Sequence, residues 1–537
     1  MSATIKSLSV GALKAALHDG AEIAILDARE EVPYDARHLL MASCVSLSRL
    51  ELTVDAGVPS RNTRVVWCDD DGIGDGLAQR AAERMASLGY TNVAVLTGGI
   101  AEWEAAGYRI YSGVHVPSKA FAEVVEHEAS TPWITAEQLK KLIDDKADIA
   151  LFDSRSYDEF HANSIPTAIS VPGAELVYRF ADMAPSPNTL VVVNCGGRTR
   201  SIIGAQSLIN AGVPNKVVSL KNGTQAWHLA GYEVLKSITA QPPAVTLAGH
   251  AAARAAAARV AQRFGVTRID EATLTRWRAD TDKTTYVFDV RTPAEYRASH
   301  MPGVKSVPGG QLVQETDRHA MVWGARVVLV DDDGVRAVMT AHWMKQMGWD
   351  AYAMTVDMRS SQKETGPWAP SVLGLNKVSG VNVSVIDAAA LDQRMKAGNT
   401  AVIDVDWSSA YIAGHIPGAW YGLRSRLSEI VSKLPPRNAI VLTSQDGILA
   451  RLAAADLAAS SKTPVFALVG GTAAWQAVGY PLEQGATHMA TAPDDIRLKA
   501  REQNQDIEAA MRAYLSWEIE LVNQMATDDD QRFRIQR

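Results

Sequence analysis

The chain has few cysteines and no excess of positive charge. Only three of its 537 residues are cysteine, an odd and sparse set that rules out a disulfide framework and indicates a reducing compartment. The formal net charge is −7, which argues against a general binder of nucleic acid or anionic membranes, because such proteins need clustered lysine and arginine. Any anion site is therefore expected to be local.

Long apolar runs are also missing. No run nears the roughly 18 residues that a membrane span needs, and the N-terminus lacks the basic and apolar regions of a signal peptide. We therefore expect a cytoplasmic protein without a membrane partner. The length predicts about three to five domains, and the hydrophobic fraction of 47% is ample for packed cores.

One unit is repeated four times along the chain. Each copy begins with an apolar strand that ends in aspartate: Asp27, Asp153, Asp289 or Asp404. A second strand signal follows, near Val45, Ile169, Val304 or Ala419, and then a strongly apolar strand: "RVVWC", "LVVVN", "RVVLV" or "AIVLT". The residues directly after this strongly apolar strand are Asp69, Cys195, Asp331 and Ser444, at offsets of 42, 42, 42 and 40 from the aspartates.

Each unit is expected to be a small α/β domain. Strands that are apolar throughout alternate with helical patterns, which indicates a mostly parallel sheet flanked by helices. The predicted domains span residues 1–112, 130–240, 264–372 and 380–486. Helical connectors are expected within 112–133 and 249–265, and a loop at 359–375 before the fourth domain.

The remaining residues, 487–537, predict a C-terminal helical tail. Apolar residues recur there at helical spacing, from Ile507 to Met525. The tail is expected to pack on the chain's own body, and it leaves a homodimer open.

The stretch "CGGRTR" at residues 195–200 concentrates reactive groups in one loop. A loop that leads from a parallel strand into a helix lies at the sheet edge where open α/β folds bind ligands. Gly196 and Gly197 are expected to adopt conformations closed to other residues, so that N–H groups turn inward around an anion or a bound sulfur. Arg198 and Arg200 add positive charge, which is expected to lower the pKa of Cys195 and make it a thiolate nucleophile.

The other two cysteines are predicted to be structural. Cys68 lies one residue short of the nucleophile's position, which Asp69 fills, and its acidic neighbours raise a thiol pKa. Cys44 has no reactive setting. The alternative for Cys195 is likewise a buried structural thiol, since free cysteine is often buried, but two nearby arginines disfavour it.

The four copies also differ in a way that excludes one histidine position as the general base. His38, His300 and His415 stand eleven residues after their aspartates, whereas the thiol-bearing copy has Ser164. A histidine found only in copies without the thiol is expected to make a structural hydrogen bond. Asp153 and Arg155 have counterparts in those copies and are predicted to be scaffold.

The acidic loops that begin at Asp69 and Asp331 offer a choice between two roles. Clustered carboxylates bind Mg²⁺ or Ca²⁺ in some proteins, but aspartates in this position more often cap the following helix. We expect caps, and neither a metal nor a cofactor is predicted.

The ordered motifs resemble the rhodanese family of sulfurtransferases. The carriers of this resemblance are the Asp-x-Arg pairs that begin at Asp27, Asp153 and Asp289, the "AGHIPGA" stretch at 413–419, the closing glycine pairs with tryptophan at 98–103 and 470–475, and the "CGGRTR" loop. The resemblance extends to about residue 485. It implies four tandem rhodanese-like domains, of which only the second, with Cys195, is catalytic.

The resemblance also implies a reaction. Cys195 takes sulfane sulfur from an anionic donor, and thiosulfate is favoured because "CGGRTR" differs from the mercaptopyruvate-type "CGSGVT". Expected acceptors are cyanide in assays and a thiol such as glutathione or a thioredoxin-like protein. The donor is expected to contact Arg198, Arg200 and Arg179, and the amides of Gly196, Gly197, Arg198, Thr199 and Arg200 to hold the persulfide.

Two alternatives remain open at this point. Cysteine phosphatases and arsenate reductases also place a thiolate among amides, but their loops have five residues between Cys and Arg, whereas four separate Cys195 from Arg200. The chain would otherwise be a persulfide carrier, or a scaffold that docks partners in sulfur handling.

Overall fold

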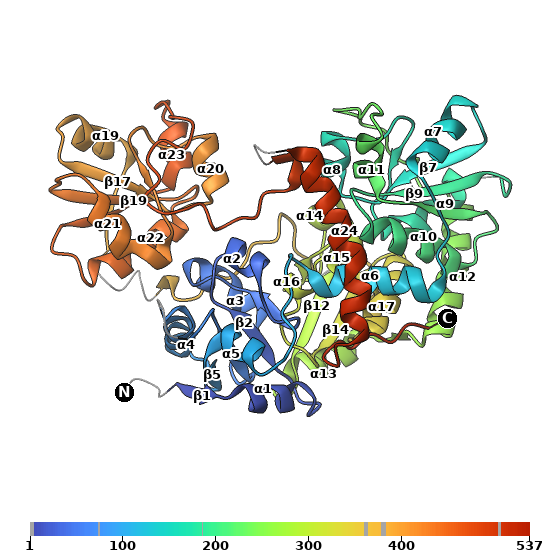
Figure 1. The fold of residues 1–537 in the computed structure, drawn as a ribbon, viewed down its shortest axis with the longest axis horizontal. Helices are drawn as coiled ribbons and strands as arrows, with labels where there is room; N and C mark the ends of the chain where they lie inside the picture. The colour runs from blue at the N-terminus through green and yellow to red at the C-terminus, as the bar shows by residue number, and fades with distance from the viewer. Residues whose placement is uncertain are drawn as a thin grey trace. The chain divides into compact units, whose positions relative to one another are not determined.

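The computed structural model describes residues 5–72, 76–184, 186–358, 363–376, 383–502 and 506–536. It divides the chain into two compact units (Figure 1). One unit comprises Met1–Lys14, Ile25–Val114 and Pro370–Arg497, and holds the first and fourth domains. The other comprises Ala15–Ala24, His115–Ala369 and Leu498–Arg537, and holds the second and third domains with the C-terminal helix. Among the described residues, no helix has the length and apolar character to span a membrane.

The first domain has a five-stranded sheet in the order β1-β5-β4-β2-β3, with parallel pairing of β1 with β5, β4 with β5 and β2 with β3. Its strands are β1 (Lys6–Leu8), β2 (Ala24–Asp27), β3 (Ala42–Cys44), β4 (Val65–Cys68) and β5 (Val93–Leu96). Its helices are α1 (Val10–Leu17), α2 (Glu31–Ala36), the 3-10 turn η1 (Leu47–Arg49), α3 (Leu50–Gly57), α4 (Leu77–Ser87) and α5 (Gly99–Ala105).

The second domain repeats this order as β6-β10-β9-β7-β8, with every pair parallel. Its strands are β6 (Trp133–Ile134), β7 (Ile149–Asp153), β8 (Ile169–Ser170), β9 (Leu190–Asn194) and β10 (Val217–Leu220). Its helices are α7 (Ala136–Asp144), α8 (Tyr157–Ala162), α9 (Glu175–Met183), α10 (Thr199–Ala211) and α11 (Gly223–Leu229), preceded by the connector α6 (Val116–Ala129).

The third domain has the order β11-β15-β14-β12-β13, again all parallel. Its strands are β11 (Thr267–Arg268), β12 (Thr285–Asp289), β13 (Lys305–Ser306), β14 (Arg326–Asp331) and β15 (Asp350–Thr355). Its helices are α13 (Glu271–Ala279), α14 (Pro293–Ala298), α15 (Gly309–Gln314), α16 (Thr316–His319) and α17 (Arg336–Gln346), preceded by the connector α12 (Leu247–Phe264).

The fourth domain has the parallel order β16-β20-β19-β17-β18. Its strands are β16 (Ser384–Ile386), β17 (Thr400–Asp404), β18 (Trp420–Tyr421), β19 (Ala439–Thr443) and β20 (Val465–Leu468). Its helices are α19 (Ala388–Lys396), α20 (Ser408–Ala413), η2 (Arg424–Arg426), α21 (Leu427–Lys433), α22 (Ile448–Ala458) and α23 (Gly471–Ala477). Part of the loop expected at 359–375 lies outside the described residues.

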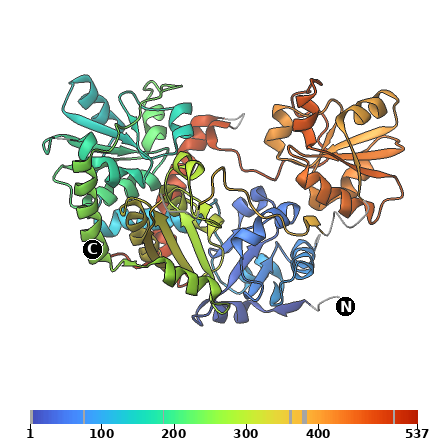
Figure 2. The ribbon, with the colours of Figure 1, turned by 180° about the vertical axis from the view of Figure 1, so that it is seen from behind.

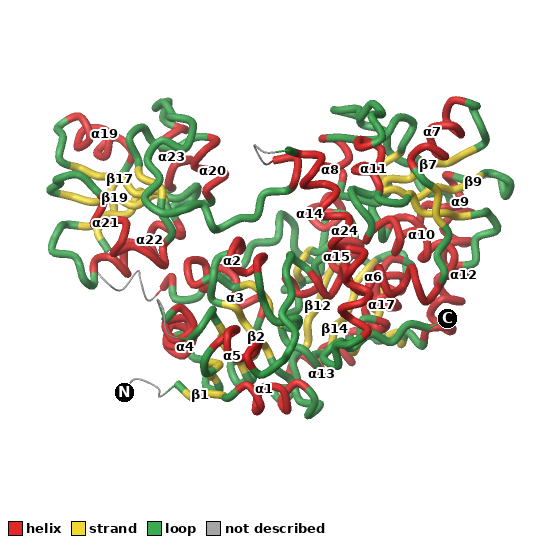
Figure 3. Tube along the Cα trace, viewed as in Figure 1, coloured by secondary structure: helices red, strands yellow, loops and turns green. Residues whose placement is uncertain are grey.

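The strongly apolar strand of each repeat lies third in its sheet, with strands on both sides and helices on both faces (Figure 3). This position explains its composition: Val191, Val192 and Val193 of β9 are fully buried. The predicted parallel α/β domains are therefore confirmed. Because each such strand ends at the carboxyl edge of its sheet, the loop after it occupies the same place in all four domains.

The tail forms η3 (Ala500–Glu502) and the long helix α24 (Ile507–Ala526). Helix α24 packs against α6, as predicted for a helix on the chain's own body, and both helices belong to the unit of the second domain (Figures 1 and 2). Its buried side includes Met511, Leu515, Leu521 and Met525.

The repeated histidines are structural, as the comparison of copies predicted. Nδ1 of His300 lies 2.7 Å from the carbonyl oxygen of Tyr296, and the two rings stack with centroids 3.7 Å apart. The pairs His38 with Tyr34 and His415 with Tyr411 repeat this arrangement. Each histidine fixes the turn after its short helix.

We expect His300→Ala to lower the stability of the third domain by about 1–3 kcal/mol, because a buried hydrogen bond and a stacked ring are lost together. Scanning calorimetry of the full chain measures this as a lower transition temperature. His127→Ala is the control, since the His127 side chain is 73% exposed. Equal transition temperatures for the two variants would contradict the structural role.

Candidate active site

A buried polar network lies behind Cys195. Asn194, the last residue of β9, donates from Nδ2 to Asp153 Oδ2 at 3.0 Å, and Asp153 pairs with Arg155 at 2.6 Å. A Cβ on Gly196 would lie 3.8 Å from Cδ of Arg155, so the arginine stem borders the loop. Asp153 and Arg155 thus hold the start of the loop, and Asp27 with Arg29 and Asp289 with Arg291 form the same pair in thiol-free domains.

The first carbonyl groups of the loop are directed at helix α11. The Cys195 oxygen accepts from the N–H of Thr224 at 2.8 Å and from its hydroxyl at 3.0 Å, and the Gly196 oxygen accepts from Gln225 N–H at 3.1 Å. Gly223 makes this approach possible: its φ is +53°, and a Cβ there would overlap the Cys195 oxygen. These hydrogen bonds from the start of α11 therefore fix the orientation of the loop backbone.

The N–H groups of the loop, in contrast, remain open. Within the described parts of the chain, the five N–H groups of residues 196–200 donate to no protein acceptor. They precede or begin helix α10, where the first N–H groups have no partner in their own helix. These are the N–H groups that the sequence predicted to hold an anion, and donors at a helix start suit that role.

In the other three domains, carboxylates accept from N–H groups of the corresponding loop. Asp69 accepts from Gly72 at 2.8 Å, Asp333 from Val335 and Arg336 at 2.7 and 3.0 Å, and Asp446 from Ile448 at 2.9 Å. Asp69, Asp331 and Ser444, which stand in the place of Cys195, also accept from the N–H groups of Ala78, Ala337 and Ala450, at 2.9, 2.9 and 3.2 Å. The acidic residues therefore act as caps, as expected.

The two glycines act differently from the prediction. Neither Gly196 nor Gly197 has a positive φ, so the loop does not use their conformational freedom. Gly197 is needed for space: a Cβ there would lie 3.0 Å from Oε2 of Glu518 and 3.3 Å from a ring carbon of Tyr514, both on α24. The expectation of unusual backbone conformations at these two positions was wrong.

The Arg198 guanidinium, predicted to bind the donor, is engaged by carboxylates. Its Nε lies 2.7 Å from Oε1 of Glu123, and it also pairs with Glu126, both on α6. Its third partner is the Asn222 side-chain oxygen at 3.0 Å. Burial raises the pKa of Glu123 to about 7 despite this pairing.

The Arg200 guanidinium is paired as well. It lies 2.6 Å from Glu159 of α8 and donates to the Gln311 side chain at 3.0 Å. The same pair recurs in the third domain, where Arg336 binds Glu295. Both predicted anion-binding arginines therefore have intramolecular counterions.

The pKa of Cys195 shifts in the direction opposite to the prediction. Burial raises it, since the residue is only 2% exposed. The charge of Arg200 acts against this rise, as do the nearby hydroxyl and N–H of Ser201, which both donate to the Arg198 carbonyl oxygen; the charge of the Glu518 carboxyl adds to it. The expected lowering of the thiol pKa was wrong because the guanidinium charges are offset by carboxylates and the site is buried.

Helix α24 contacts the loop through Glu518 and Tyr514. Oε1 of Glu518 accepts from the Thr199 hydroxyl at 3.3 Å and from the Tyr514 hydroxyl at 2.8 Å. Glu518 itself is 1% exposed. Of the predicted site residues, Cys195 through Arg200 thus lie together, and Thr199 contacts α24 through its side chain as well.

Arg179 lies apart from this group. Its Nε pairs with Glu175 at 2.6 Å, and its Nη1 donates to the Pro243 oxygen at 3.2 Å. Among the described residues, no hydrogen bond or ion pair joins it to the loop 195–200. Its predicted contact with the donor therefore has no support in the structure.

The remaining cysteines fit the structural role predicted for them. Cys68 is fully buried, its Sγ contacts the Leu26 carbonyl oxygen at 3.6 Å, and burial raises its pKa. Burial likewise raises the pKa of Cys44.

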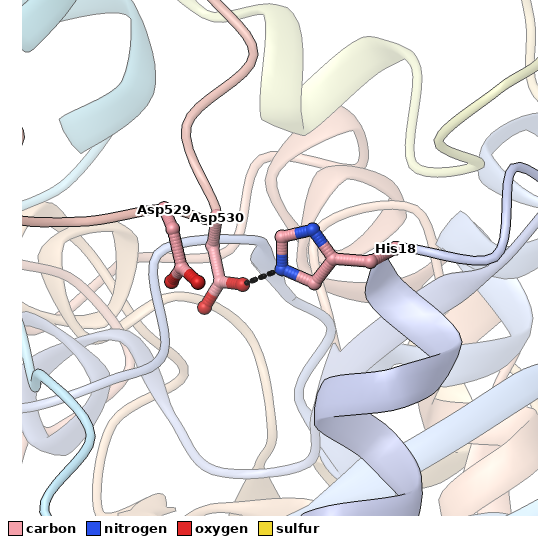
Figure 4. Close-up of side chains that lie close together, drawn as sticks. All are labelled: His18, Asp529 and Asp530. Carbon is pink, nitrogen blue, oxygen red and sulfur yellow. Dashed lines mark hydrogen bonds and ion pairs between the residues drawn. The ribbon is translucent and has the colours of Figure 1, made fainter.

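Three residues that the sequence did not single out are close enough to hold a cation. His18 follows α1, Asp529 and Asp530 follow α24, and their ligand atoms lie within 4.8 Å of one another (Figure 4). His18 Nε2 and Asp530 Oδ1 are 2.9 Å apart. Exposed groups of this kind are common without an ion, and this one shares no residue with the Cys195 loop.

The sequence is similar to a known domain family in four places. The model of the rhodanese-like domain matches residues 9–106, 135–230, 272–360 and 387–478. The chain belongs to the rhodanese family. A search of curated protein sequences returned no match.

Among the solved structures that match, a thiosulfate sulfurtransferase aligns over nearly the whole chain. It comes from Pseudomonas aeruginosa and is 44% identical, with 99% of this chain and 100% of that chain covered and a TM-score of 0.95. The Escherichia coli 3-mercaptopyruvate sulfotransferase SseA, described as having the rhodanese fold, is 17% identical over 41% of this chain and 98% of its own, with a TM-score of 0.18. A rhodanese-like domain from Anabaena is 27% identical over 23% of this chain and 96% of its own, with a TM-score of 0.18.

The raised pKa gives a direct test of the site. We expect the rate at which iodoacetamide alkylates Cys195 to increase with pH up to and beyond about pH 9, because only the thiolate reacts and burial disfavours it. Peptide mass spectrometry separates Cys195 from Cys44 and Cys68. A rate already constant at about pH 7 would show that the thiol pKa is lowered.

Proposed function

We propose that this rhodanese is a thiosulfate sulfurtransferase that carries sulfane sulfur on Cys195. The observation that supports the proposal most strongly is the pairing of a thiol with five N–H groups that have no acceptor in the described structure. Three further loops of the same fold hold a carboxylate or hydroxyl in that place. The 44%-identical thiosulfate sulfurtransferase agrees with this choice of activity.

The reaction has two steps in this proposal. The Cys195 thiolate attacks the outer sulfur of thiosulfate, the bond between the two thiosulfate sulfurs breaks, and sulfite leaves with the bonding electrons. A nucleophilic acceptor then attacks the terminal sulfur of the persulfide and restores the thiolate. With cyanide the product is thiocyanate. Glutathione or a thioredoxin-like protein is the candidate biological acceptor.

The loop N–H groups have the chief role in stabilisation. A persulfide anion brings a terminal sulfur and a negative charge, and N–H donors at a helix start suit both. Arg200 contributes a favourable field at the sulfur although Glu159 offsets part of it. Arg198 acts through position: its ion pairs tie the loop to α6, and its hydrogen bond to Asn222 ties the loop to the start of α11.

The persulfide carrier is the second candidate, because burial of Cys195 and three thiol-free domains also suit slow turnover and partner docking. Steady-state assays with thiosulfate and cyanide distinguish it from the enzyme. An adduct on Cys195 that does not turn over indicates the carrier. Turnover of an aryl phosphate at a comparable rate would instead indicate a phosphatase.

Cys195→Ser is expected to reduce thiocyanate production by at least about a thousandfold, because a hydroxyl cannot form the persulfide. Intact mass spectrometry after incubation with thiosulfate should lose the added mass of about 32 Da. Cys68→Ser is the matched control and should keep both signals. Retention of transfer in Cys195→Ser would overturn the assignment.

A further inference from the structure

A carboxyl group from the C-terminal helix faces the Cys195 loop. Glu518 lies 319 positions beyond Thr199 in the sequence, yet its Oε1 accepts the Thr199 hydroxyl and its Oε2 lies beside Gly197. Helix α24 carries it there by packing on α6, as Figure 1 shows for the two helices of this unit. The group is thus held by packing against the same loop that carries the thiol.

The hydrogen-bond partners of its two oxygens indicate the protonation state of this carboxyl. Oε1 has two donors, the hydroxyls of Thr199 and Tyr514. Oε2 is buried and has no hydrogen-bond partner in the described structure. An ionised carboxylate with one bare oxygen is costly at 1% exposure, whereas a proton on Oε2 removes the charge and makes that oxygen a donor.

The charges around Glu518 are mixed. On α6, Lys119 favours its ionised form, whereas Glu123 opposes ionisation; on the loop, Arg198 favours ionisation and Cys195 carries the opposing thiolate when charged. Tyr514 is the titratable neighbour on α24 itself. Burial has the largest effect and raises the pKa of Glu518 above its usual range.

The geometry points to a role in donor selection that rests on the proposed function. We propose that Glu518 is a specificity-determining residue of the donor site: protonated, it offers a hydrogen bond to an oxygen of the oxyanion donor bound at the loop N–H groups, and ionised, it repels that donor. Two observations carry this proposal: the N–H groups of residues 196–200 have no acceptor among the described residues, and the unpartnered Oε2 of Glu518 lies beside Gly197 of the same loop.

Binding to thiol-free protein tests this without interference from the thiol. Calorimetric titration of thiosulfate into Cys195→Ser is expected to give a dissociation constant that increases about tenfold or more between about pH 5.5 and about pH 8.5, because a dianion meets a new buried charge. In the double variant Cys195→Ser with Glu518→Gln, the increase should be much smaller than in Cys195→Ser, since glutamine stays a neutral donor, and the increase that remains is that of Glu123, whose pKa is about 7. Glu123 and Lys119 are present in both proteins, so the difference isolates Glu518.

The control is Cys195→Ser with Glu520→Gln, which removes an exposed carboxylate from the same helix and should behave as Cys195→Ser does. Parallel pH dependence with and without Glu518, or no thiosulfate binding in either protein, would overturn the inference. Tyr514→Phe in the Cys195→Ser protein gives a second test: loss of a donor to Oε1 should move the inflection to higher pH, and an unchanged inflection also counts against the role.

Failure of this inference is separable from failure of the proposed function. The mass increase of about 32 Da on wild-type protein treated with thiosulfate depends on Cys195 and reports the sulfur transfer itself. If that adduct forms while the pH dependence is insensitive to Glu518, the sulfurtransferase assignment remains and only the role of Glu518 is wrong.

Discussion

The start of a helix after a buried parallel strand leaves backbone N–H groups that need an acceptor, and this chain meets the need in two ways. In the first, third and fourth domains, carboxylates of the loop supply it: Asp69, Asp333 and Asp446 accept from loop N–H groups. In the second domain, Cys195 follows the strand and the N–H groups of residues 196–200 have no described acceptor. In our proposal, these open N–H groups bind an external anion.

The charges at the site follow from burial. A guanidinium group in a buried position requires a counterion, and Glu123 and Glu159 provide one each for Arg198 and Arg200. These pairs fix the loop firmly but cancel much of the field that would otherwise ionise the thiol. The raised pKa of Cys195 is the consequence, and the charge of the Glu518 carboxyl adds to it. In the proposed reaction, stabilisation therefore comes mainly when the donor and the new persulfide engage the N–H groups.

Much of the architecture was predictable because repeated patterns carry it. Four apolar strands at constant offsets from Asp27, Asp153, Asp289 and Asp404 indicated four sheets, and the position of Cys195 at a strand end indicated its loop. The ion pair of Arg200 with Glu159 was also predictable from the sequence. Glu159 and Glu295 stand at the same offset from the aspartates Asp153 and Asp289, and so do Arg200 and Arg336. A pair that recurs in a thiol-free domain is scaffold by the reasoning that excluded the histidines.

Other features of the site could not be predicted from the sequence around Cys195. Glu518 and Glu123 reach the loop from helices outside the repeated unit, so no comparison among copies reveals them. The role of Gly197 depends on the same helix, because space for Glu518 and not backbone conformation requires a glycine there. Arg179 shows the converse error: an arginine near the expected site in sequence is held by Glu175 elsewhere on the domain.

The central claim is that the open N–H groups of residues 196–200 hold the transferred sulfur. A crystal structure of the full chain after exposure to thiosulfate tests it most directly. The account predicts one extra sulfur atom bonded to Sγ of Cys195 and within hydrogen-bond distance of several of these N–H groups. An unmodified Cys195, or an added sulfur that points away from them, would contradict it.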